Sequence, residues 1–505
     1  MSEQTKTKAA ILLELVDRAS PVLFHTETGE PFARVRVADH FENLPIQGPE
    51  FAAWLKLLAW RATNETVNSE ALEGVRGVLA ARALFDGREH RVRNRVAWHD
   101  GAIWYDLSDS QWRAIRVTPD GWQLVADVPI LFRRYAHQTA QVLPEPAGRL
   151  SEAESFLNLR ASQDSEGRTV DDERYLFLVA LMSFFVPDIP HPVIVLHGEH
   201  GAAKTTLSRI ARELIDPSAT PTVGEPKREE IGQLLQHNYL LPFDNLSYLP
   251  NWLSDTLCRA ITGDGLSKRR LYTDEQDVIF SFRRCIVLNG INSVASRPDL
   301  LDRSILLECQ PIPDDQRSPE RDFWERFASA KARILGGMFD ALSRAMRLKD
   351  GLCLPHLPRM ADFAEWGCAI AEACGWGQNT FLHAYTTEAS GRNLVAVDSN
   401  LVTQALIGLM SKHQEWSGTA AQLLTALSEV TPDLGIDTCG QGWPKQPHVL
   451  SRRVNEVVPN LRRLGIRITH GWRGSQKIIS IRRSGDRGNS DGSDGSVGSG
   501  ESEST

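Results

Sequence analysis

Apolar residues change their spacing from one region of the chain to the next, and these changes predict where domains begin and end. Over 31–145, a helical segment at 51–60 precedes short alternating runs separated by Asp-Gly and Ser-Asp-Ser turns. This pattern predicts a small antiparallel meander. Pro-Glu-Pro-Ala-Gly at 144–148 is typical of a linker. Residues 1–145 are therefore expected to form a mixed α+β domain without a recognisable catalytic constellation.

Short, continuous apolar runs alternate with helical segments in the next region, 150–348. The runs are 193–196, 239–243, 285–288 and 304–307. Strands that lack polar alternation are buried on both faces, as in a parallel sheet covered by helices. From 323 to 346 apolar residues recur at helical spacing. The expected fold class is α/β, with a central parallel sheet in this region.

The remainder of the chain divides into three parts. Helices are expected over 349–415, followed by a small unit at 416–483. That unit is predicted to end in a helix at about 447–464 and a two-stranded wing. The last 22 residues, 484–505, are rich in Gly, Ser, Asp and Glu. Such a tail cannot bury a core, so it is expected to be disordered and acidic.

Charge is distributed unevenly along the chain. The 505 residues are 42% hydrophobic and 24% charged, which is ordinary globular composition for about three domains. The net charge is −8, yet residues 440–483 hold ten Lys or Arg and one Glu. A basic module in an acidic chain indicates a polyanionic partner. A solvated charged surface is the alternative.

The seven cysteines and the longest apolar run indicate the expected compartment. The cysteines are scattered and form no CxxC pair, which favours reduced thiols over a disulfide framework or zinc site. The run at 175–186 is too short to span a bilayer. The N-terminus lacks the apolar core and cleavage site of a secretory signal. A cytoplasmic protein without a membrane partner is expected.

A glycine-containing segment follows the first apolar run of 150–348. Its sequence, Gly-Glu-His-Gly-Ala-Ala-Lys-Thr-Thr, is close to G-x-x-x-x-G-K-[ST], with the strand before and the helix after that this motif requires. Backbone N–H groups of such a loop face a phosphate. Lys204 would neutralise the β/γ oxygens, and Thr205 would place its hydroxyl on Mg²⁺. The residues expected to contact the nucleotide are Gly198, Glu199, His200, Gly201, Ala202, Ala203, Lys204, Thr205 and Thr206.

Ala203 stands where the pattern has its second glycine. If that position requires a positive φ, alanine costs about 1 kcal/mol there. Gly201 is then expected to supply the flexibility of the loop. The alternative interpretation is a glycine turn that merely precedes a helix beginning with Lys-Thr.

Polar residues at the ends of the other runs complete a candidate catalytic set. Asp244, forty residues after Lys204, would hold Mg²⁺ through water. Asn245 stands where many such enzymes place Glu, and an amide can orient water but is not a base, which puts fast hydrolysis in doubt. Asn289 would face the γ-phosphate and the attacking water. Arg303 would project into a neighbouring subunit's nucleotide. Alone, each is a turn residue or a solvated side chain.

In this order the motifs resemble the AAA+ superfamily of P-loop ATPases, and within it the superfamily III helicases. The likeness is greatest to the primase-associated helicase proteins of phages, plasmids and mobile elements. Lys204 and Thr205 match Walker A, Asp244 matches Walker B, and Asn289 matches the polar sensor of motif C. The resemblance covers about 150–350. It implies an ATP- and Mg²⁺-dependent ring of identical subunits.

The resemblance also suggests DNA contacts. The segment 257–272 is similar to an extra family motif that leads to a hairpin gripping single-stranded DNA in the ring channel. By that likeness the candidate contacts are Lys268, Arg269 and Arg270. A Lys-Arg-Arg cluster is otherwise a charged surface. Residues 1–145 show no recognisable primase triad, so primer synthesis is not expected.

The basic module resembles the winged helix often attached to these helicases. Apolar residues at helical spacing would bury one face of the helix, and Arg452 and Arg453 would face duplex DNA. Lys445, Arg473 and Lys477 are suited to phosphate contacts, which give affinity without sequence choice. A winged helix used for protein contacts is the alternative.

These observations together predict an ATP-binding, ATP-hydrolysing, helicase-like motor of phage- or plasmid-type DNA replication. The expected cofactors are ATP and Mg²⁺, and the expected partners are DNA, further copies of the chain and a primase or other replication protein. A nucleotide-gated DNA-binding regulator or loader with little hydrolysis is the second hypothesis, motivated by Asn245. A non-enzymatic scaffold is the third.

Overall fold

The chain divides into two compact units, residues 1–392 and 393–505, and each is described by itself. The structure is a computed structural model. It describes residues 7–160, 162–163, 169–170, 172–246, 248–264, 266–269, 277–280, 283–290, 297–313, 315, 317–352, 354, 358–387, 401–434, 436, 438, 443–474 and 476–483.

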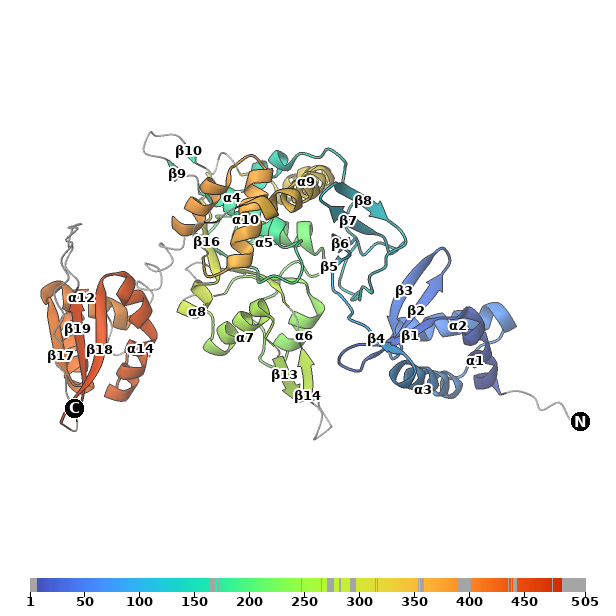
Figure 1. The fold of residues 1–505 in the computed structure, drawn as a ribbon, viewed down its shortest axis with the longest axis horizontal. Coiled ribbons are helices and arrows are strands. Elements are labelled where there is room, and N and C mark those ends of the chain that lie inside the picture. The colour runs from blue at the N-terminus through green and yellow to red at the C-terminus, as the bar shows by residue number, and fades with distance from the viewer. Residues whose placement is uncertain are drawn as a thin grey trace, which may run out of the picture. The chain divides into compact units, whose positions relative to one another are not determined.

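Residues 8–89 form a sheet covered by helices (Figure 1). The elements are α1 (Lys8–Ala19), β1 (Val22–His25), β2 (Pro31–Val37), β3 (His40–Pro45), α2 (Pro49–Thr63), α3 (Ser69–Phe85) and β4 (Arg88–Glu89). The strand order is β3-β2-β1-β4. Leu72, Val75 and Leu79, spaced three and four residues apart, place one buried face of α3 in this core. Of these elements, the sequence analysis predicted only a helix at 51–60, which lies within α2.

The predicted meander is confirmed. Its strands are β5 (Val96–His99), β6 (Ala102–Asp106), β7 (Ala114–Thr118) and β8 (Gly121–Val125), antiparallel in the order β5-β6-β7-β8. Asp100 and Gly101 both have positive φ, 51° and 68°, which suits the two-residue turn between β5 and β6. The indole of Trp122 donates to Asp340 (2.8 Å), so the meander is tied to the long helix α9 (Glu320–Leu348).

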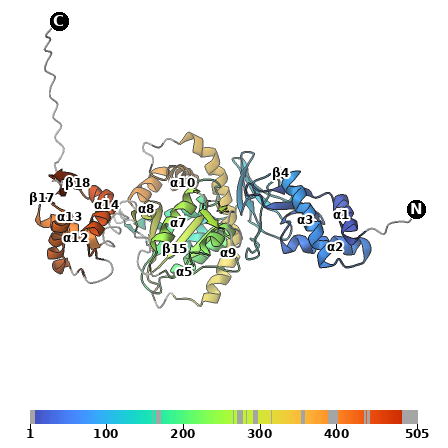
Figure 2. The ribbon, with the colours of Figure 1, turned by 90° about the horizontal axis from the view of Figure 1, so that it is seen from below.

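A four-stranded parallel sheet forms the centre of the larger unit (Figure 2). Its strands are β11 (Val193–His197), β12 (Leu240–Phe243), β15 (Cys285–Asn289) and β16 (Ser304–Glu308), in the order β12-β15-β11-β16. Nearly every residue in them is buried, as continuous apolar runs predict. Pro242 lies in β12, one of the two edge strands of this sheet, where a missing N–H is tolerated.

The helices that contact this sheet are α4 (Asp172–Ser183), α5 (Lys204–Ile215), α7 (Asn251–Thr262) and α8 (Pro298–Leu301). The same region also contains α6 (Ile231–His237). α9 packs on β7 and β8 of the meander, and α10 (Ala361–Ala373) packs on α4 and α9. Because all four strands run the same way, their carboxyl ends lie at one edge of the sheet and their amino ends at the other. We call these the carboxyl edge and the amino edge.

A separate hairpin leaves this region between α7 and β15 (Figure 1). Its strands are β13 (Leu266–Arg269) and β14 (Asp277–Phe280), paired antiparallel so that Lys268 lies opposite Val278. The predicted DNA contacts Lys268 and Arg269 are therefore in β13. Arg270 lies outside the described residues.

The second unit packs three helices against a three-stranded antiparallel sheet. Its elements are α12 (Leu401–Lys412), β17 (Glu415–Gly418), α13 (Ala420–Val430), α14 (Pro447–Arg463), β18 (Ile466–Arg473) and β19 (Gln476–Arg483), with strand order β17-β19-β18. The predicted helix and two following strands are present. α14 continues through Pro459. α12, in the range 349–415 that was assigned to a separate helical region, contributes Val402 and Leu406 to this core.

Neither a membrane-spanning helix nor a cluster of metal-binding side chains occurs in the part of the chain that the structure describes. No helix there is long and apolar enough to cross a bilayer. No group of three or more His, Cys, Asp or Glu side chains there is placed to hold a metal ion.

Candidate functional site

The segment 198–203 connects β11 to α5 at the carboxyl edge, and its shape depends on its glycines. Gly198 has a φ of 139°, and a side chain there would collide with the backbone carbonyl of Cys309. Gly201 has a φ of 78°. Both conformations favour glycine, and at Gly198 the Cys309 carbonyl leaves no room for a side chain.

Ala203 occupies the position that the motif gives to glycine, and its backbone is left-handed. Its φ and ψ are 56° and 25°, at the N-cap of α5. The condition under which alanine is costly is therefore met, and the strain is about 1 kcal/mol. A strained residue held in place by the surrounding fold is typical of functional loops.

Lys204 and Thr205 begin α5 and point back over the loop and across to β12. The Lys204 ammonium donates to the carbonyls of Gly198 (2.8 Å) and Glu199 (2.6 Å). The Thr205 hydroxyl donates to Oδ1 of Asp244 (2.9 Å). Asp244 directly follows β12, so two residues far apart in sequence meet at one edge of the sheet.

Asn289, at the end of β15, links the strands behind this pair. It is buried, at 1% exposure. Its Oδ1 accepts from the backbone N–H of Asn245 (2.8 Å), and its Nδ2 donates to the hydroxyl of Ser208 in α5 (2.9 Å). Both ends of the amide are used, so Asn289 fixes the backbone after Asp244 relative to α5.

Asn245 follows Asp244 in a left-handed conformation, with a φ of 56°. Asn tolerates this region better than most residues because its short amide can bond locally. The backbone therefore gives a physical reason for Asn here that is independent of catalysis. Glu at this position would add strain.

Arg317 lies beside the loop and was not singled out from the sequence. Its Nη2 is 3.8 Å from the position that a Cβ on Gly201 would occupy. It is a guanidinium, the group best suited to bind a phosphate in a bidentate manner. It lies in the segment between β16 and α9, and no motif marks it, so only the fold could reveal it.

His197 ends β11 and directly precedes the loop, and burial affects its pKa. Desolvation by burial lowers the pKa of His197, and Glu308 acts in the opposite direction. The imidazole is therefore neutral at physiological pH. It adds no positive charge to the loop, where Lys204 supplies the cation within the motif.

Arg303 lies at the other edge of the sheet. It directly precedes β16, its backbone carbonyl accepts from Val193 at the start of β11, and its guanidinium donates to the carbonyl of Asp299 (2.7 Å). β11 is five residues long, so about 16 Å of strand separates Arg303 from the loop after β11. The structure does not bring Arg303 together with the other candidate catalytic residues of the same chain.

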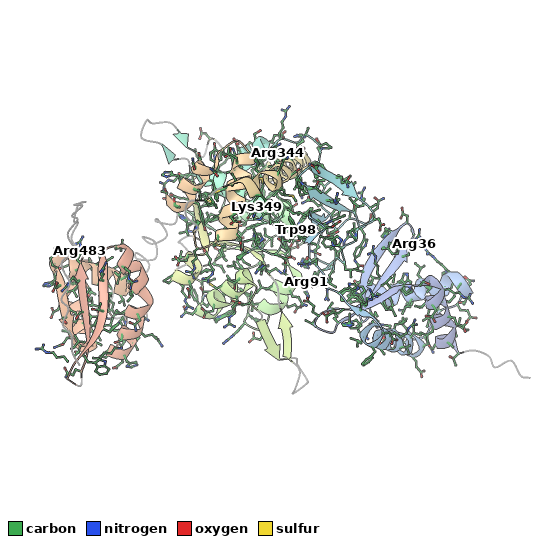
Figure 3. All side chains as sticks on the ribbon, in the orientation of Figure 1. Arg36, Arg91, Trp98, Arg344, Lys349 and Arg483 are labelled. Atoms are coloured by element: carbon green, nitrogen blue, oxygen red, sulfur yellow. The ribbon has the colours of Figure 1, made fainter. Side chains whose placement is uncertain are left out.

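The basic candidates of the second unit lie on its last helix and hairpin. Arg452 is exposed on α14, while Val454 and Leu461 are buried beneath it. Arg473 and Lys477 are exposed at the tip of the β18–β19 hairpin. Three further basic residues there are Arg453, which is half-buried, Lys445, which donates to the Thr438 carbonyl (2.6 Å), and Arg483, the exposed end of β19 (Figure 3).

Trp472 is an exposed aromatic residue beside these basic side chains. It is 74% exposed and lies opposite Lys477 in the strand register. A large aromatic ring beside two cations is suited to stack on a nucleic-acid base.

Comparisons with known proteins show which families this chain is similar to. Residues 168–390 match the family model described as the actinomycete integrative conjugative element replication protein. Residues 402–494 match the model described as the AICE RepA C-terminal domain. No curated protein matches the chain. In its central and C-terminal regions the chain is thus similar to replication proteins of integrative conjugative elements, which supports a replication-associated protein.

Two solved structures are also similar in outline. One is the apo C-terminal region of NrS-1, at 12% identity and a TM-score of 0.41, covering 95% of this chain and 100% of that one. The other is the active helicase Cch of SCCmec type IV, at 10% identity and a TM-score of 0.41, covering 92% and 93%. At a TM-score below 0.5 these likenesses establish neither a shared fold nor a shared activity.

Proposed function

We propose that this protein is an ATP-driven, helicase-like motor of mobile-element DNA replication, built on a P-loop domain of the AAA+ type. The contact between Thr205 and Asp244 is the observation that supports this most strongly. It joins the hydroxyl and the carboxylate that a nucleotide-bound Mg²⁺ requires. The matches to replication-protein families support the setting.

The groups at the carboxyl edge fit Mg-ATP chemically. The loop amides between Gly198 and Lys204 offer donors to phosphate oxygens. The glycine at 198 lets the start of the loop pack closely on the Cys309 backbone. Oxygen ligands from Thr205 and Asp244 suit a hard divalent cation. Mg²⁺ bound there would neutralise charge on the β- and γ-phosphates.

Each chain residue then has a defined task. The Lys204 ammonium exchanges the carbonyls that it contacts for phosphate oxygens. Asn289 holds the backbone of Asn245 in place, and the Asn245 amide orients the attacking water. Arg317, beside Gly201, adds positive charge from the same chain.

Arg303 acts on the nucleotide of a neighbouring subunit. It lies at the amino edge, far from the loop of its own chain, which supports a role at the nucleotide of another copy. A guanidinium supplied across an interface stabilises the charge of the transition state. The active form is thus a homo-oligomeric ring.

DNA contacts come from both units. The β13–β14 hairpin, with Lys268 and Arg269 in its first strand, engages single-stranded DNA in the ring. The second unit has the element order of a winged helix, and α14 with Arg452 contacts duplex DNA. Phosphate contacts of this type make binding strongly dependent on salt.

A regulator or loader that binds ATP with little hydrolysis is a second candidate. The observation in its favour is Asn245, which supplies no base and is held in a left-handed conformation. This candidate predicts tight ATP binding without strand separation.

ATP hydrolysis measured with and without single-stranded DNA tests the proposal. The expected result is hydrolysis that DNA stimulates and that Lys204→Ala abolishes, while Lys227→Ala, which removes an exposed lysine elsewhere, has no effect. Tight ATP binding with negligible turnover in both conditions would favour the regulator. Absence of ATP binding would exclude both.

The DNA-binding role of the second unit has its own test. Arg452→Ala combined with Arg453→Ala is expected to weaken duplex binding and to flatten its salt dependence by about one unit of slope per lost contact. A salt titration that matches that of the unaltered protein would reject this role.

A further inference from the structure

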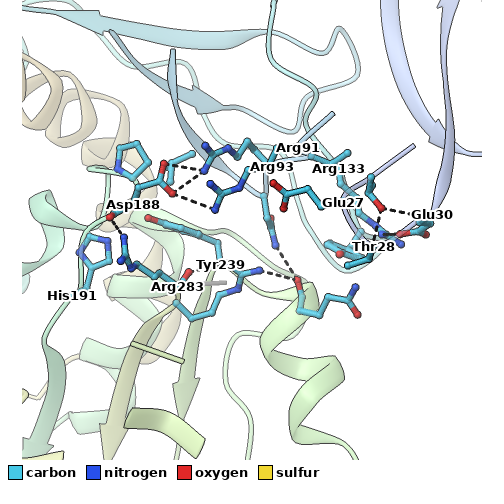
Figure 4. Close-up of a pocket in the computed structure, with 18 residues that line it drawn as sticks. Glu27, Thr28, Glu30, Arg91, Arg93, Arg133, Asp188, His191, Tyr239 and Arg283 are labelled. Carbon is cyan, nitrogen blue, oxygen red and sulfur yellow. Dashed lines mark hydrogen bonds and ion pairs between the residues drawn. The ribbon is translucent and has the colours of Figure 1, made fainter. Parts of the chain in front are cut away.

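A cleft of about 190 Å³ lies at the amino edge of the parallel sheet (Figure 4). Segments far apart in the sequence form it. They are the β1–β2 loop near Glu27, the residues around Arg91 that follow β4, and the segments that precede β11, β12 and β15. It is therefore a different site from the loop at the carboxyl edge, and no residue in it was singled out from the sequence.

Arginines dominate the charge of this cleft. Five arginines and three carboxylates line it, which leaves an excess of positive charge. The arginines are Arg91, Arg93, Arg133, Arg283 and Arg284, and the carboxylates are Glu27, Glu30 and Asp188. An excess of guanidinium groups in a concave site focuses a positive potential and attracts anions.

Asp188 organises two of these arginines. Its Oδ1 and Oδ2 accept from Nη1 of Arg93 at 2.8 and 3.0 Å, and its Oδ1 is 3.6 Å from Nη2 of Arg91. Burial acts to raise the pKa of Asp188, but the Arg93 hydrogen bond and the nearby arginine charges hold it below its usual value. The carboxylate is therefore ionised and fixes both guanidiniums at the rim.

The floor of the cleft is rigid. Arg283 donates to the carbonyl of Thr262 (3.1 Å) and to that of Asp188, and Arg284 donates to the carbonyl of Leu235 (2.5 Å). His191 also lines the cleft, at 2% exposure, and its Nδ1 has no hydrogen-bond partner among the described residues. A buried polar atom without a partner is unfavourable unless a ligand or water meets it.

Arg91 is the side chain most available to a ligand. Half of it is exposed, and its ion pair with Asp188 is at 3.6 Å, longer than a hydrogen bond. Arg133 is held more firmly, by Glu30 at 2.5 Å. A phosphate oxygen entering the rim would therefore meet Arg91 first.

The size and surroundings of the cleft indicate the kind of anion. About 190 Å³ is smaller than the roughly 300–1,000 Å³ of typical small-molecule pockets. The Tyr135 ring already stacks on His237 (4.2 Å between centroids) and lies under Arg133 (4.9 Å), so it offers no open face to a base. These features favour phosphate and sugar groups of a polymer over a free nucleotide.

The position in the chain links the cleft to nucleic acid. Arg283 follows β14 of the hairpin by three residues. Arg283 also contacts Thr262 and Gly263, which precede β13, so the base of the hairpin adjoins the floor of the cleft. We propose that the cleft binds the phosphate backbone of a DNA strand, chiefly through Arg91 and Arg93. This inference rests on the proposed DNA-associated function.

Binding of a fluorescent single-stranded oligonucleotide by the full chain, followed by anisotropy over a range of salt, tests the inference. Arg91→Ala combined with Arg93→Ala is expected to weaken binding about tenfold and to lower the salt slope by about one to 1.5, for two lost contacts at roughly 0.7 each. The control, Lys56→Ala with Arg61→Ala on the exposed face of α2, removes the same charge and is expected to leave the slope unchanged.

Glu27→Gln supplies a test of opposite sign. It removes a negative charge from the exposed rim and is expected to tighten binding two- to threefold by the same electrostatic mechanism. Because Glu27 is exposed in the loop between β1 and β2, this variant tests the site even if loss of Arg93 perturbs folding.

The outcomes separate this inference from the proposed function. DNA binding by the unaltered chain with variants that behave like the control overturns the cleft and leaves the proposed function standing. No DNA binding by the unaltered chain overturns both. If the double variant weakens ATP binding and leaves DNA affinity unchanged, the cleft is a small-nucleotide site and the inference is wrong.

Discussion

Charged side chains make different kinds of contact at the two edges of the central sheet. At the carboxyl edge, the polar groups around Lys204 bond to one another and to backbone carbonyls within a short loop. At the amino edge, guanidiniums such as Arg283 and Arg303 precede the strands and are held by carbonyls and carboxylates. The same four strands thus present a compact, backbone-built site on one side and a broad, side-chain-built surface on the other.

This difference indicates that the two edges suit different kinds of ligand. Backbone amides in a fixed loop suit one small, multiply charged ligand, because their geometry is set by the fold. Arginines on several segments suit an extended anion, because each contributes independently. We therefore propose that nucleotide binds at the carboxyl edge and that DNA and a neighbouring subunit bind at the amino edge.

The largest expected effect comes from Arg303, which tests whether the amino edge serves a neighbour's nucleotide. Arg303→Ala is expected to lower hydrolysis about 10³-fold with little change in ATP binding, because the group acts on the transition state. Arg321→Ala, at an exposed position on α9, is the control.

Mixing Arg303→Ala with Lys204→Ala subunits sharpens this test. If the arginine acts across subunits, mixed rings regain activity at some interfaces and depart from simple averaging. Activity that follows the average at every ratio would place Arg303 outside catalysis.

Asp244→Asn tests the carboxyl edge. The amide keeps the size of the side chain and its contact with Thr205 but removes the charge that faces Mg²⁺, so hydrolysis is expected to fall about 100-fold. Asp120→Asn, in the exposed β7–β8 turn, is the matched control. Unchanged turnover over a magnesium titration would contradict the assignment.

The pH dependence of stability tests the burial of the amino edge. Burial, with the charge of Arg283, lowers the pKa of His191 to about 3. The unfolded chain binds this proton near pH 6.5 and the folded chain does not, so the stability is complete above about 6.5 and falls below it. The expected loss is about 1.4 kcal/mol per pH unit from this group between pH 6 and 4.

Urea unfolding at pH 7.5, 6 and 5 measures this loss. His237, whose pKa burial lowers to about 4, adds to the total, so the comparison is with His191→Gln. The free energy of unfolding should fall less steeply with decreasing pH for His191→Gln than for the unaltered protein. The two slopes should differ by up to the equivalent of one bound proton. Parallel curves for the two proteins would show that His191 is not buried as described.

Ala203→Gly is the smallest expected change. Glycine adopts the φ of 56° without strain, so the free energy of unfolding should rise by up to about 1 kcal/mol, seen as a higher Tm. A decrease in Tm would mean that the alanine methyl group packs favourably in the loop.

The sequence revealed what is local. The loop at 198–206, the apolar strands and the meander turns are each contiguous, so their residue types determine their conformation directly. The sheet of β1 to β3 was missed, although Ala33 to Val37 alternate apolar and polar residues as a strand with one buried face does. The helix α3 was missed as well, and its contacts with α1, β1 and β2 are all tertiary.

The amino-edge cleft could not be predicted from the sequence. It unites positions near 27, 91, 133, 188 and 283, which only the fold brings together. The same holds for Arg317 beside Gly201 and for the bonds of Asn289 to Asn245 and Ser208. Motif order predicted which residues lie at strand ends, but not which of their atoms bond to one another.

Titration of the protein with ATP in the presence of Mg²⁺ tests the central claim most directly. Binding is expected for the unaltered chain and for Lys227→Ala, and it should weaken at least about 100-fold for Lys204→Ala, because the ammonium contacts the phosphates. Equal binding by all three proteins, or by none, would contradict the assignment of the loop at the carboxyl edge as a nucleotide site.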